Sequence, residues 1–71
     1  MRNVSARDLL ARNLRRLRSE AGLSQEELAH RAQLDRTYIS ALERSVYAAT
    51  VDVLERLAKG LEIEVHELLR P

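Results

Sequence analysis

Apolar residues recur along most of the chain at spacings of three and four, which is the period of an amphipathic α-helix. The clearest stripe joins Leu10, Leu14 and Leu17. Together with the polar residues around them, such stripes predict helical segments at residues 5–21, 25–32, 36–44, 51–59 and 64–69. No segment reads as a strand. The pattern therefore predicts an all-α fold, with residues 1–71 forming a single domain whose core spans about residues 5–70.

Polar residues and glycines bound these segments. Ser24 and Glu27 are spaced as a capping box, in which each side chain accepts a hydrogen bond from the other residue's backbone amide. The further N-caps that we expect are Ser5, which is paired with Asp8, then Asp35 and Thr50. Gly22 and Gly60 can take the left-handed conformation that ends many helices, so they are predicted to end the first and fourth segments.

The net charge of the chain is only +1, but the charges are unevenly distributed. Residues 1–18 carry six arginines and one aspartate, which gives +5. Residues 19–45 and residues 46–71 each carry three basic and five acidic side chains, which gives −2 in each part. A positive field at one end of a chain favours an anionic partner such as nucleic acid. A solvated arginine face on the first helix is an equally good interpretation.

Several classes of function find no support in the sequence. Cysteine is absent, and His30 and His66 fall in different segments, so we expect neither a disulfide nor a metal site. No Ser-His-Asp set, carboxylate pair or glycine-rich phosphate loop is evident, so we expect no enzyme activity and no cofactor. No apolar run approaches the roughly 20 residues of a membrane span, and the N-terminus lacks an apolar signal segment. These observations predict a soluble protein of a reducing compartment.

The spacing of the second and third segments carries the functional interpretation. Only three residues separate residues 25–32 from residues 36–44, so the two helices have no room to run antiparallel and must cross steeply. With Leu28, Ile39 and Leu42 facing inward, the outer face of the later helix stays exposed. A helix-turn-helix uses this arrangement to place its second helix in the major groove of DNA.

The stretch "LSQEELAHRAQLDRTYISALER" resembles the helix-turn-helix of the phage-repressor-like (Cro/C1, or XRE) family of transcriptional regulators. Together with "LRRLRSEAGLSQ" and "LERLAKGLEIEVHELL", the resemblance covers nearly the whole chain. Within the family, "LDRTYIS" and "KGLE" are similar to controller proteins of restriction–modification systems. The resemblance implies a compact five-helix, lambda-repressor-like domain that regulates transcription in the cytoplasm of a bacterium or in phage-infected cells.

The resemblance also implies roles for particular residues. Six positions are expected to contact DNA: Gln25, Arg36, Thr37, Tyr38, Ser40 and Arg44. Gln25 would meet a phosphate at a helix N-terminus. Arg36 would pair bidentately with guanine, and Thr37 and Ser40 would touch bases or phosphates. Tyr38 would lie at the groove wall, or half-buried against the preceding helix, and Arg44 would meet the opposite backbone.

Glu43 would repel phosphate and therefore needs a different role. In the family, a glutamate at this position pairs with an arginine of the first helix, and the matching residue here is Arg18. The resemblance thus implies an Arg18–Glu43 ion pair that ties the first helix to the recognition helix, and the loss of one partner of such a buried pair typically costs about 3–5 kcal/mol.

The chain departs from the family pattern at two places. Gln33 occupies a turn position that usually holds glycine, so we expect either a left-handed Gln33 with about 1 kcal/mol of strain or a remodelled turn. Val46 and Tyr47 replace loop residues that often meet phosphate. They could serve a protein contact instead, or pack on the fourth helix.

A single recognition helix reads few base pairs, so selectivity in a genome favours a dimer that reads two half-sites. The apolar side chains at the C-terminus predict its interface: Val65, Leu68 and Leu69, extended by Ile63 and Val53. The alternative is that these side chains complete the core of the monomer. We therefore predict a homodimer on double-stranded DNA with a pseudo-palindromic operator. The alternative function is a small antitoxin or adaptor that acts mainly through protein contacts.

Overall fold

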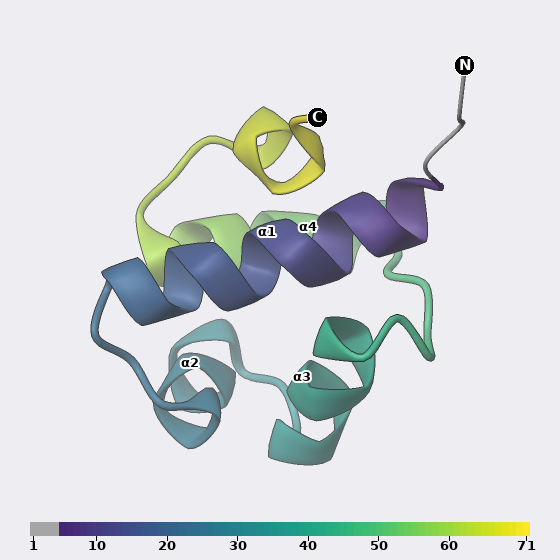
Figure 1. Ribbon diagram of the computed structural model, residues 1–71. Helices are drawn as coiled ribbons and strands as arrows, with labels where there is room; N and C mark the ends of the chain where they lie inside the picture. The colour runs from purple at the N-terminus through teal and green to yellow at the C-terminus, as the bar shows by residue number, and fades with distance from the viewer. Residues whose placement is uncertain (1–4) are drawn as a thin grey trace.

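The computed structural model describes residues 5–71 and places them in four α-helices and one short 3₁₀ helix (Figure 1). The α-helices are α1 (Ala6–Glu20), α2 (Gln25–Ala32), α3 (Arg36–Glu43) and α4 (Val51–Leu61), and the 3₁₀ helix is η1 (Val65–Leu69). No strand occurs in the part of the chain that the structure describes. Helix α1 crosses the middle of the molecule, with α2 and α3 on one side and η1 on the other (Figure 1). The all-α class and the helix-turn-helix of α2 and α3 are confirmed.

The prediction of five α-helices is wrong at its last element, because residues 65–69 form a 3₁₀ helix. The segment is closed by Pro71, which disfavours the α conformation in the residue before it, and Arg70 is accordingly extended. Only five residues remain between Glu64 and Arg70, and short helical pieces of this kind commonly take i→i+3 hydrogen bonds. The Glu67 N–H donates to the carbonyl of Glu64 at 3.1 Å in this way.

The predicted N-caps are all present. Ser24 and Glu27 form the reciprocal capping box at the start of α2, with hydrogen bonds of 3.0 and 2.8 Å. The other α-helices begin after caps that accept from backbone amides in the first turn: Ser5, Asp35 and Thr50. In three of the four helices the cap is a Ser or Thr that accepts from the backbone N–H three residues later. In α3 the cap is Asp35, which accepts from the N–H of Thr37.

All four α-helices end with the same backbone motif. A residue in the left-handed conformation donates to the carbonyl three residues back, and the next residue donates to the carbonyl five residues back, at 2.8 to 3.2 Å. The left-handed residues are Gly22, Gln33, Ser45 and Glu62, with φ between 57° and 72°. The left-handed alternative expected for Gln33 is therefore confirmed. Only Gly22 is a glycine, so Ser45 and Glu62 carry the same backbone strain as Gln33.

Gly60 does not end α4, contrary to the prediction, because the helix continues to Leu61 and its left-handed residue is Glu62. A Cβ added to Gly60 would lie 3.3 Å from both the Cβ of Arg31 and a methyl carbon of Leu28. The glycine therefore permits a close approach of α4 to α2, which is a packing requirement rather than a stop signal.

One hydrophobic core joins all five elements. Its members are buried Leu, Ile and Ala side chains: Leu10, Leu14, Leu17, Leu23, Leu28, Ala29, Ala32, Ile39, Leu42, Leu57, Ala58, Leu61 and Leu68. Helix α2 packs on α3 and α4, and α1 packs on α3 and η1. Val51 stands at the first position of α4 and is 71% exposed.

Asn13 is a buried polar residue within the apolar stripe of α1, with 4% of its surface exposed. Its side-chain amide donates to the carbonyls of Leu68 at 3.0 Å and Arg70 at 2.8 Å. These carbonyls close η1, so the hydrogen bonds fasten the end of the chain to α1. Sequence reasoning missed this residue, although a lone amide among stripe leucines is a usable signal for such a role.

Candidate nucleic-acid interface

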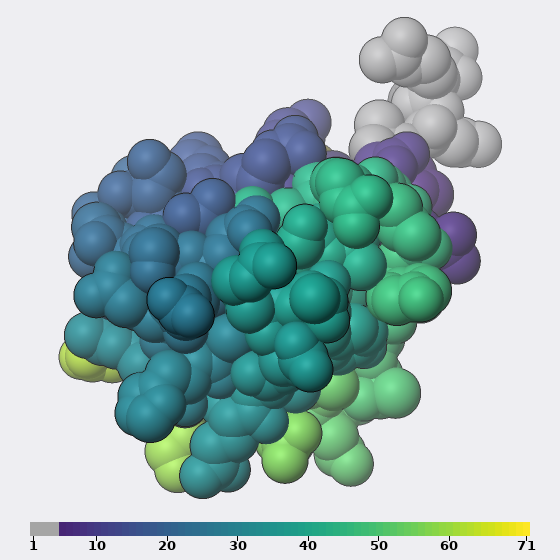
Figure 2. Space-filling model, turned by 90° about the horizontal axis from the view of Figure 1, so that it is seen from below, coloured from purple at the N-terminus to yellow at the C-terminus, as the bar shows by residue number. Residues whose placement is uncertain are grey.

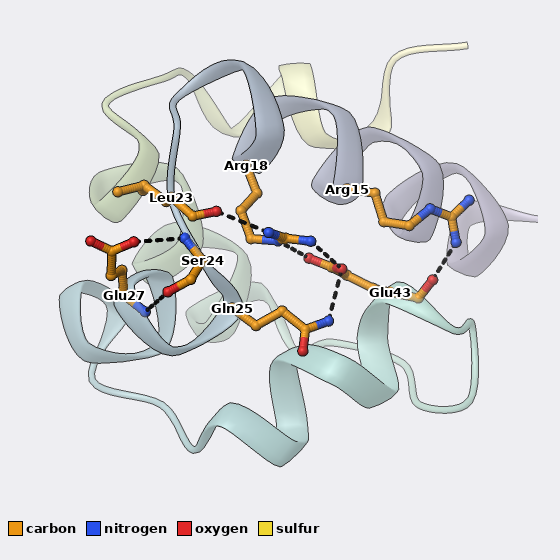
Figure 3. Close-up of polar contacts among 7 residues, drawn as sticks. All are labelled: Arg15, Arg18, Leu23, Ser24, Gln25, Glu27 and Glu43. Atoms are coloured by element: carbon orange, nitrogen blue, oxygen red, sulfur yellow. Dashed lines mark hydrogen bonds and ion pairs between the residues drawn. The ribbon is translucent and has the colours of Figure 1, made fainter.

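The inner face of α3 is fixed to α1 and α2 by the carboxylate of Glu43, which is 3% exposed (Figure 3). Arg18 donates to both carboxylate oxygens, from Nε at 2.6 Å and from a terminal nitrogen at 3.1 Å. The third donor group of Arg18 bonds the carbonyl of Leu23 at 2.9 Å. The hydrogen bonds to Glu43 raise the pKa of the Arg18 guanidinium. The structure thus contains the Arg18–Glu43 ion pair that the sequence predicts.

A second arginine of α1 reaches the same residue, because Arg15 donates to the backbone carbonyl of Glu43 (Figure 3). Arg15 is exposed but satisfies a carbonyl at the C-terminal end of α3, whereas Arg18 holds the carboxylate of the same glutamate. Arg16 makes an exposed pair with Glu20 at 3.4 Å and donates to the side-chain oxygen of Asn13 at 3.4 Å. Two of the arginines counted in residues 1–18 are thus engaged by Glu43, which lowers the value of this positive charge as evidence for an anionic partner.

Gln25 shares the carboxylate of Glu43, since its side-chain amide nitrogen donates to the carboxylate at 3.1 Å (Figure 3). An amide nitrogen carries two hydrogens, and this contact uses one of them. The other hydrogen is left without a partner among these contacts, at the N-terminus of α2, where Gln25 is the first helical residue. Glu43 therefore orients a side chain of the candidate interface as well as bracing α3.

The opposite face of α3 is open. Arg36, Thr37 and Arg44 are exposed, and Ser40 is partly exposed. Neither Arg36 nor Arg44 forms an ion pair within residues 5–71. In Figure 2, α2, α3 and the loop after α3 form one continuous face of the molecule. The structure therefore gathers the predicted contact residues of α2 and α3 on one side.

Thr37 also helps to start α3. Its backbone N–H and its hydroxyl donate to the Asp35 carboxylate, at 3.0 and 2.9 Å. The backbone bond, followed by the hydroxyl bond, lowers the pKa of Asp35. The hydroxyl oxygen of Thr37 still has its acceptor capacity, and the side chain remains exposed.

Tyr38 is half-buried, packed against the hydrophobic core and beside the loop that follows α3. Its hydroxyl donates to the carbonyl of Ala48 at 3.3 Å, and its ring centroid lies 6.1 Å from that of Tyr47. This tilted aromatic pair fixes the loop beside α3. Val46 and Tyr47 are 49% and 55% exposed, so they do not pack under α4.

The end of α3 is also fastened to the start of α1. The hydroxyl of Ser45 donates to the carboxylate of Asp8, and this bond, with a further one from Ser5, lowers the pKa of Asp8. The left-handed backbone of Ser45 places its side chain there. This bond holds the first residue of the loop after α3, and the bond from Tyr38 to Ala48 holds the loop further along.

The predicted dimer residues separate into two groups. Leu68 has no exposed surface and belongs to the core of the monomer, so its assignment to an interface is corrected. The direction of the 3₁₀ helix turns it inward. Val65 and Leu69 remain partly exposed, as do Ile63 and Val53. Leu69 also lines an apolar groove of about 180 Å³ with Leu10, Ala49 and Leu54.

Other kinds of site have little basis in the described residues. Within residues 5–71, no group of three or more histidine, cysteine or acidic side chains is placed to hold a metal ion. None of the helices of the described part is both long and apolar enough to cross a membrane.

Comparison with known proteins decides the family. Residues 14–68 match the helix-turn-helix family model. The chain belongs to the Cro/C1-type (XRE) helix-turn-helix family. Members of this family are DNA-binding transcriptional regulators and are not enzymes.

Two curated relatives illustrate the membership. A Neisseria meningitidis protein described as a hypothetical transcription factor is 43% identical over 65 residues, which cover 92% of this chain but only 61% of that protein. The control protein C.SmaI of Serratia marcescens is 43% identical over 66 residues, which cover 93% of this chain and 79% of the relative. The similarity to restriction–modification controllers that the sequence predicts is therefore confirmed.

A solved structure extends the comparison to the fold. The restriction–modification controller protein C.Esp1396I matches with a TM-score of 0.85 and 36% identity, over 94% of this chain and 92% of that one. Variant structures of this controller replace an arginine, a threonine and a tyrosine at three successive positions. The present chain contains the same triplet at Arg36, Thr37 and Tyr38.

Proposed function

We propose that this protein is a sequence-specific transcriptional regulator that binds a pseudo-palindromic operator as a homodimer, with α3 in the major groove. The observation that supports this most directly is the division of α3 into a braced inner face and an open outer face. Arg36 begins the helix, is exposed and has no acidic partner within residues 5–71. A guanidinium in this position can donate two parallel hydrogen bonds to guanine.

The other contacts follow from the same docking. Gln25 and the amides at the start of α2 meet one phosphate, and Arg44 meets the backbone on the other side of the groove. Thr37 and Ser40 touch base edges or phosphates between them. Phosphate contacts set the register of α3, so the base read by Arg36 is determined by the whole face and not by one side chain.

We infer that the dimer forms through Val65, Leu69 and the apolar groove beside them. The groove is lined from α1, the loop after α3, α4 and η1, so it lies beside the same loop that borders the candidate DNA face. A two-fold axis at this side would bring two copies of α3 to half-sites about one helical turn apart. Sedimentation velocity at tens of micromolar protein tests the dimer, and a purely monomeric species would contradict it.

Selection from random DNA duplexes tests the proposed function as a whole. The expected result is an enriched sequence with dyad symmetry, two half-sites and affinity that falls as salt rises. Enrichment of a sequence without symmetry would contradict the dimeric operator, and no enrichment at all would contradict sequence-specific binding. The latter result would favour the antitoxin or adaptor function, for which exposed Val46 and Tyr47 are the candidate contact.

A further inference from the structure

Val46 departs from a rule that the other helix ends obey. In each α-helix, the residue that follows the left-handed position is apolar: Leu23, Leu34, Val46 and Ile63. Leu23 is 8% exposed, and Leu34 and Ile63 pack partly buried against the core. Val46 alone of these four is 49% exposed. The helix-end hydrogen bonds place Val46 beside α3, where its apolar side chain stays half exposed to solvent.

The side chain of Val46 borders a hollow of about 260 Å³ between α3 and the loop. The residues that line it are Thr37, Tyr38, Ala41, Arg44, Val46 and Tyr47. Thr37, Ala41 and Arg44 follow one another at helical spacing along the side of α3 that lines the hollow, with Ala41 buried between the exposed Thr37 and Arg44. The hollow is therefore continuous with the candidate DNA face and includes three of its predicted contact residues, Thr37, Tyr38 and Arg44.

The walls of the hollow are held in place by bonds already described. The Val46 N–H donates to the carbonyl of Ala41 at 2.9 Å, which holds the backbone of Val46 at the end of α3. The Tyr38 hydroxyl bonds Ala48, and the two tyrosine rings lie against each other. Because its walls are already held in place, the hollow loses little conformational entropy when a group enters it. Walls that do not move also favour a group that matches their shape.

The chemistry of the lining selects the occupant. The floor and one wall are apolar, from Ala41, Val46 and the tyrosine rings, while Thr37 and Arg44 are polar. Among the groups that base pairs present in the major groove, only the methyl group at C5 of a pyrimidine is apolar. We propose that this hollow receives the 5-methyl group of a pyrimidine, either thymine or methylated cytosine, and thereby adds a sequence preference beyond the guanine read by Arg36. The inference rests on the proposed function, because it requires α3 to lie in the major groove.

The test begins with the duplex enriched by selection. Each thymine is replaced in turn by deoxyuridine, which lacks only the methyl group, and each cytosine is replaced in turn by 5-methylcytosine. Affinity is measured by fluorescence anisotropy for the unaltered protein. We expect one position per half-site at which the methyl group strengthens binding about fourfold, the factor expected for burial of one methyl-sized group.

Variants assign the effect to the hollow. Val46→Thr keeps the shape of the side chain and replaces one methyl group by a hydroxyl, so it should reduce the methyl-dependent factor toward one. Val51→Thr is the matched control, because Val51 is 71% exposed and lies outside the hollow. It should leave the factor unchanged. Both positions are exposed, so both variants are expected to fold, and thermal melts verify this.

Each outcome bears on the proposal. A methyl effect at a thymine, lost in Val46→Thr, supports the hollow as a thymine reader, and one at 5-methylcytosine supports it as a reader of methylated DNA. Enriched duplexes that bind equally with and without every methyl group overturn the inference and leave the proposed function standing. Weaker binding of Val46→Thr to all duplexes, with loss of the dimer in sedimentation, also overturns it and makes Val46 a protein contact. If selection enriches no duplex, the result contradicts the proposed function, and with it this inference, which depends on that function.

Discussion

The two faces of α3 use charged residues in opposite ways. On the inner face, Glu43 is buried, and it accepts from Arg18 and Gln25 through its side chain and from Arg15 through its carbonyl. On the outer face, Arg36 and Arg44 are exposed and have no ion pair within residues 5–71. A buried charge must be satisfied inside the protein, whereas an exposed one is free to be satisfied by a partner.

The difference teaches where to seek function in a short helix. The inner network makes the orientation of α3 rigid with respect to α1 and α2, and only a rigid helix can present its outer side chains at a fixed register. Each face can therefore be altered separately, with stability as the readout for the inner face and DNA affinity for the outer one.

The largest effect is expected from the inner face. Glu43→Ala removes the acceptor of Arg18 and Gln25 and should lower the free energy of unfolding by about 3 kcal/mol, toward the lower end for buried pairs because Arg18 is partly solvated. Urea denaturation measures this. The control is Glu20→Ala, which breaks the exposed pair with Arg16 and should change stability by less than about 0.5 kcal/mol. Equal effects of the two variants would show that Glu43 does not brace the fold.

The outer face should give the reverse result. Arg36→Ala is expected to weaken binding to the selected duplex by about 1–3 kcal/mol and to relax its sequence preference. Stability should stay within about 0.5 kcal/mol, since the side chain is exposed and has no intramolecular ion pair. Arg36→Lys keeps the charge without the bidentate fork, so it should retain affinity better than specificity. An Arg36→Ala protein that binds as tightly and as selectively as the unaltered one would contradict the assignment.

A smaller and stabilising effect is expected at the turn that sets α3 against α2. Gln33 has a φ of 57°, which a glycine adopts without strain. Gln33→Gly should therefore raise the free energy of unfolding by about 0.5–1 kcal/mol and leave both faces of α3 unchanged. Gly22→Ala is the converse variant and should be destabilising, because Gly22 has a φ of 72°. A destabilised Gln33→Gly protein would mean that the glutamine side chain contributes more than its backbone costs.

The smallest effect concerns acid. Hydrogen bonds lower the pKa values of Asp8, Glu27 and Asp35 in the folded protein. A lowered pKa contributes stability above the ordinary value, near pH 4, and this stability is lost as the pH falls through the folded value. Urea denaturation at pH 7, 5, 4 and 3 should show a decline below about pH 5.

The variant Asp35→Asn isolates one of these groups. An asparagine can still cap α3 but does not titrate. The difference in stability between this variant and the unaltered protein should shrink as the pH falls from about 5 to 3. A difference that is constant over that range would exclude Asp35 from the acid response.

Local chemistry was readable from the amino-acid order. Ser5, Ser24, Asp35 and Thr50 start the helices where they were expected to, because a cap and the backbone N–H that donates to it lie within three residues of each other. The turn at Gln33 was noticed only through the family pattern, which left a left-handed Gln33 and a remodelled turn as alternatives; the structure shows the first. The Arg18–Glu43 pair spans 25 residues and was reached only through the resemblance to a known family.

Long-range contacts decided the rest. Gly60 looked like a stop signal, yet its role is to let α4 approach Leu28 and Arg31. Leu68 looked like an interface residue, yet η1 turns it into the core, where Asn13 holds the carbonyls of the same segment. Val46 and Leu34 occupy equivalent positions after left-handed residues, and only the packing of helices around them buries one and exposes the other. Caps and turns depend on neighbours along the chain, whereas burial depends on which helices meet, and that is a property of the whole core.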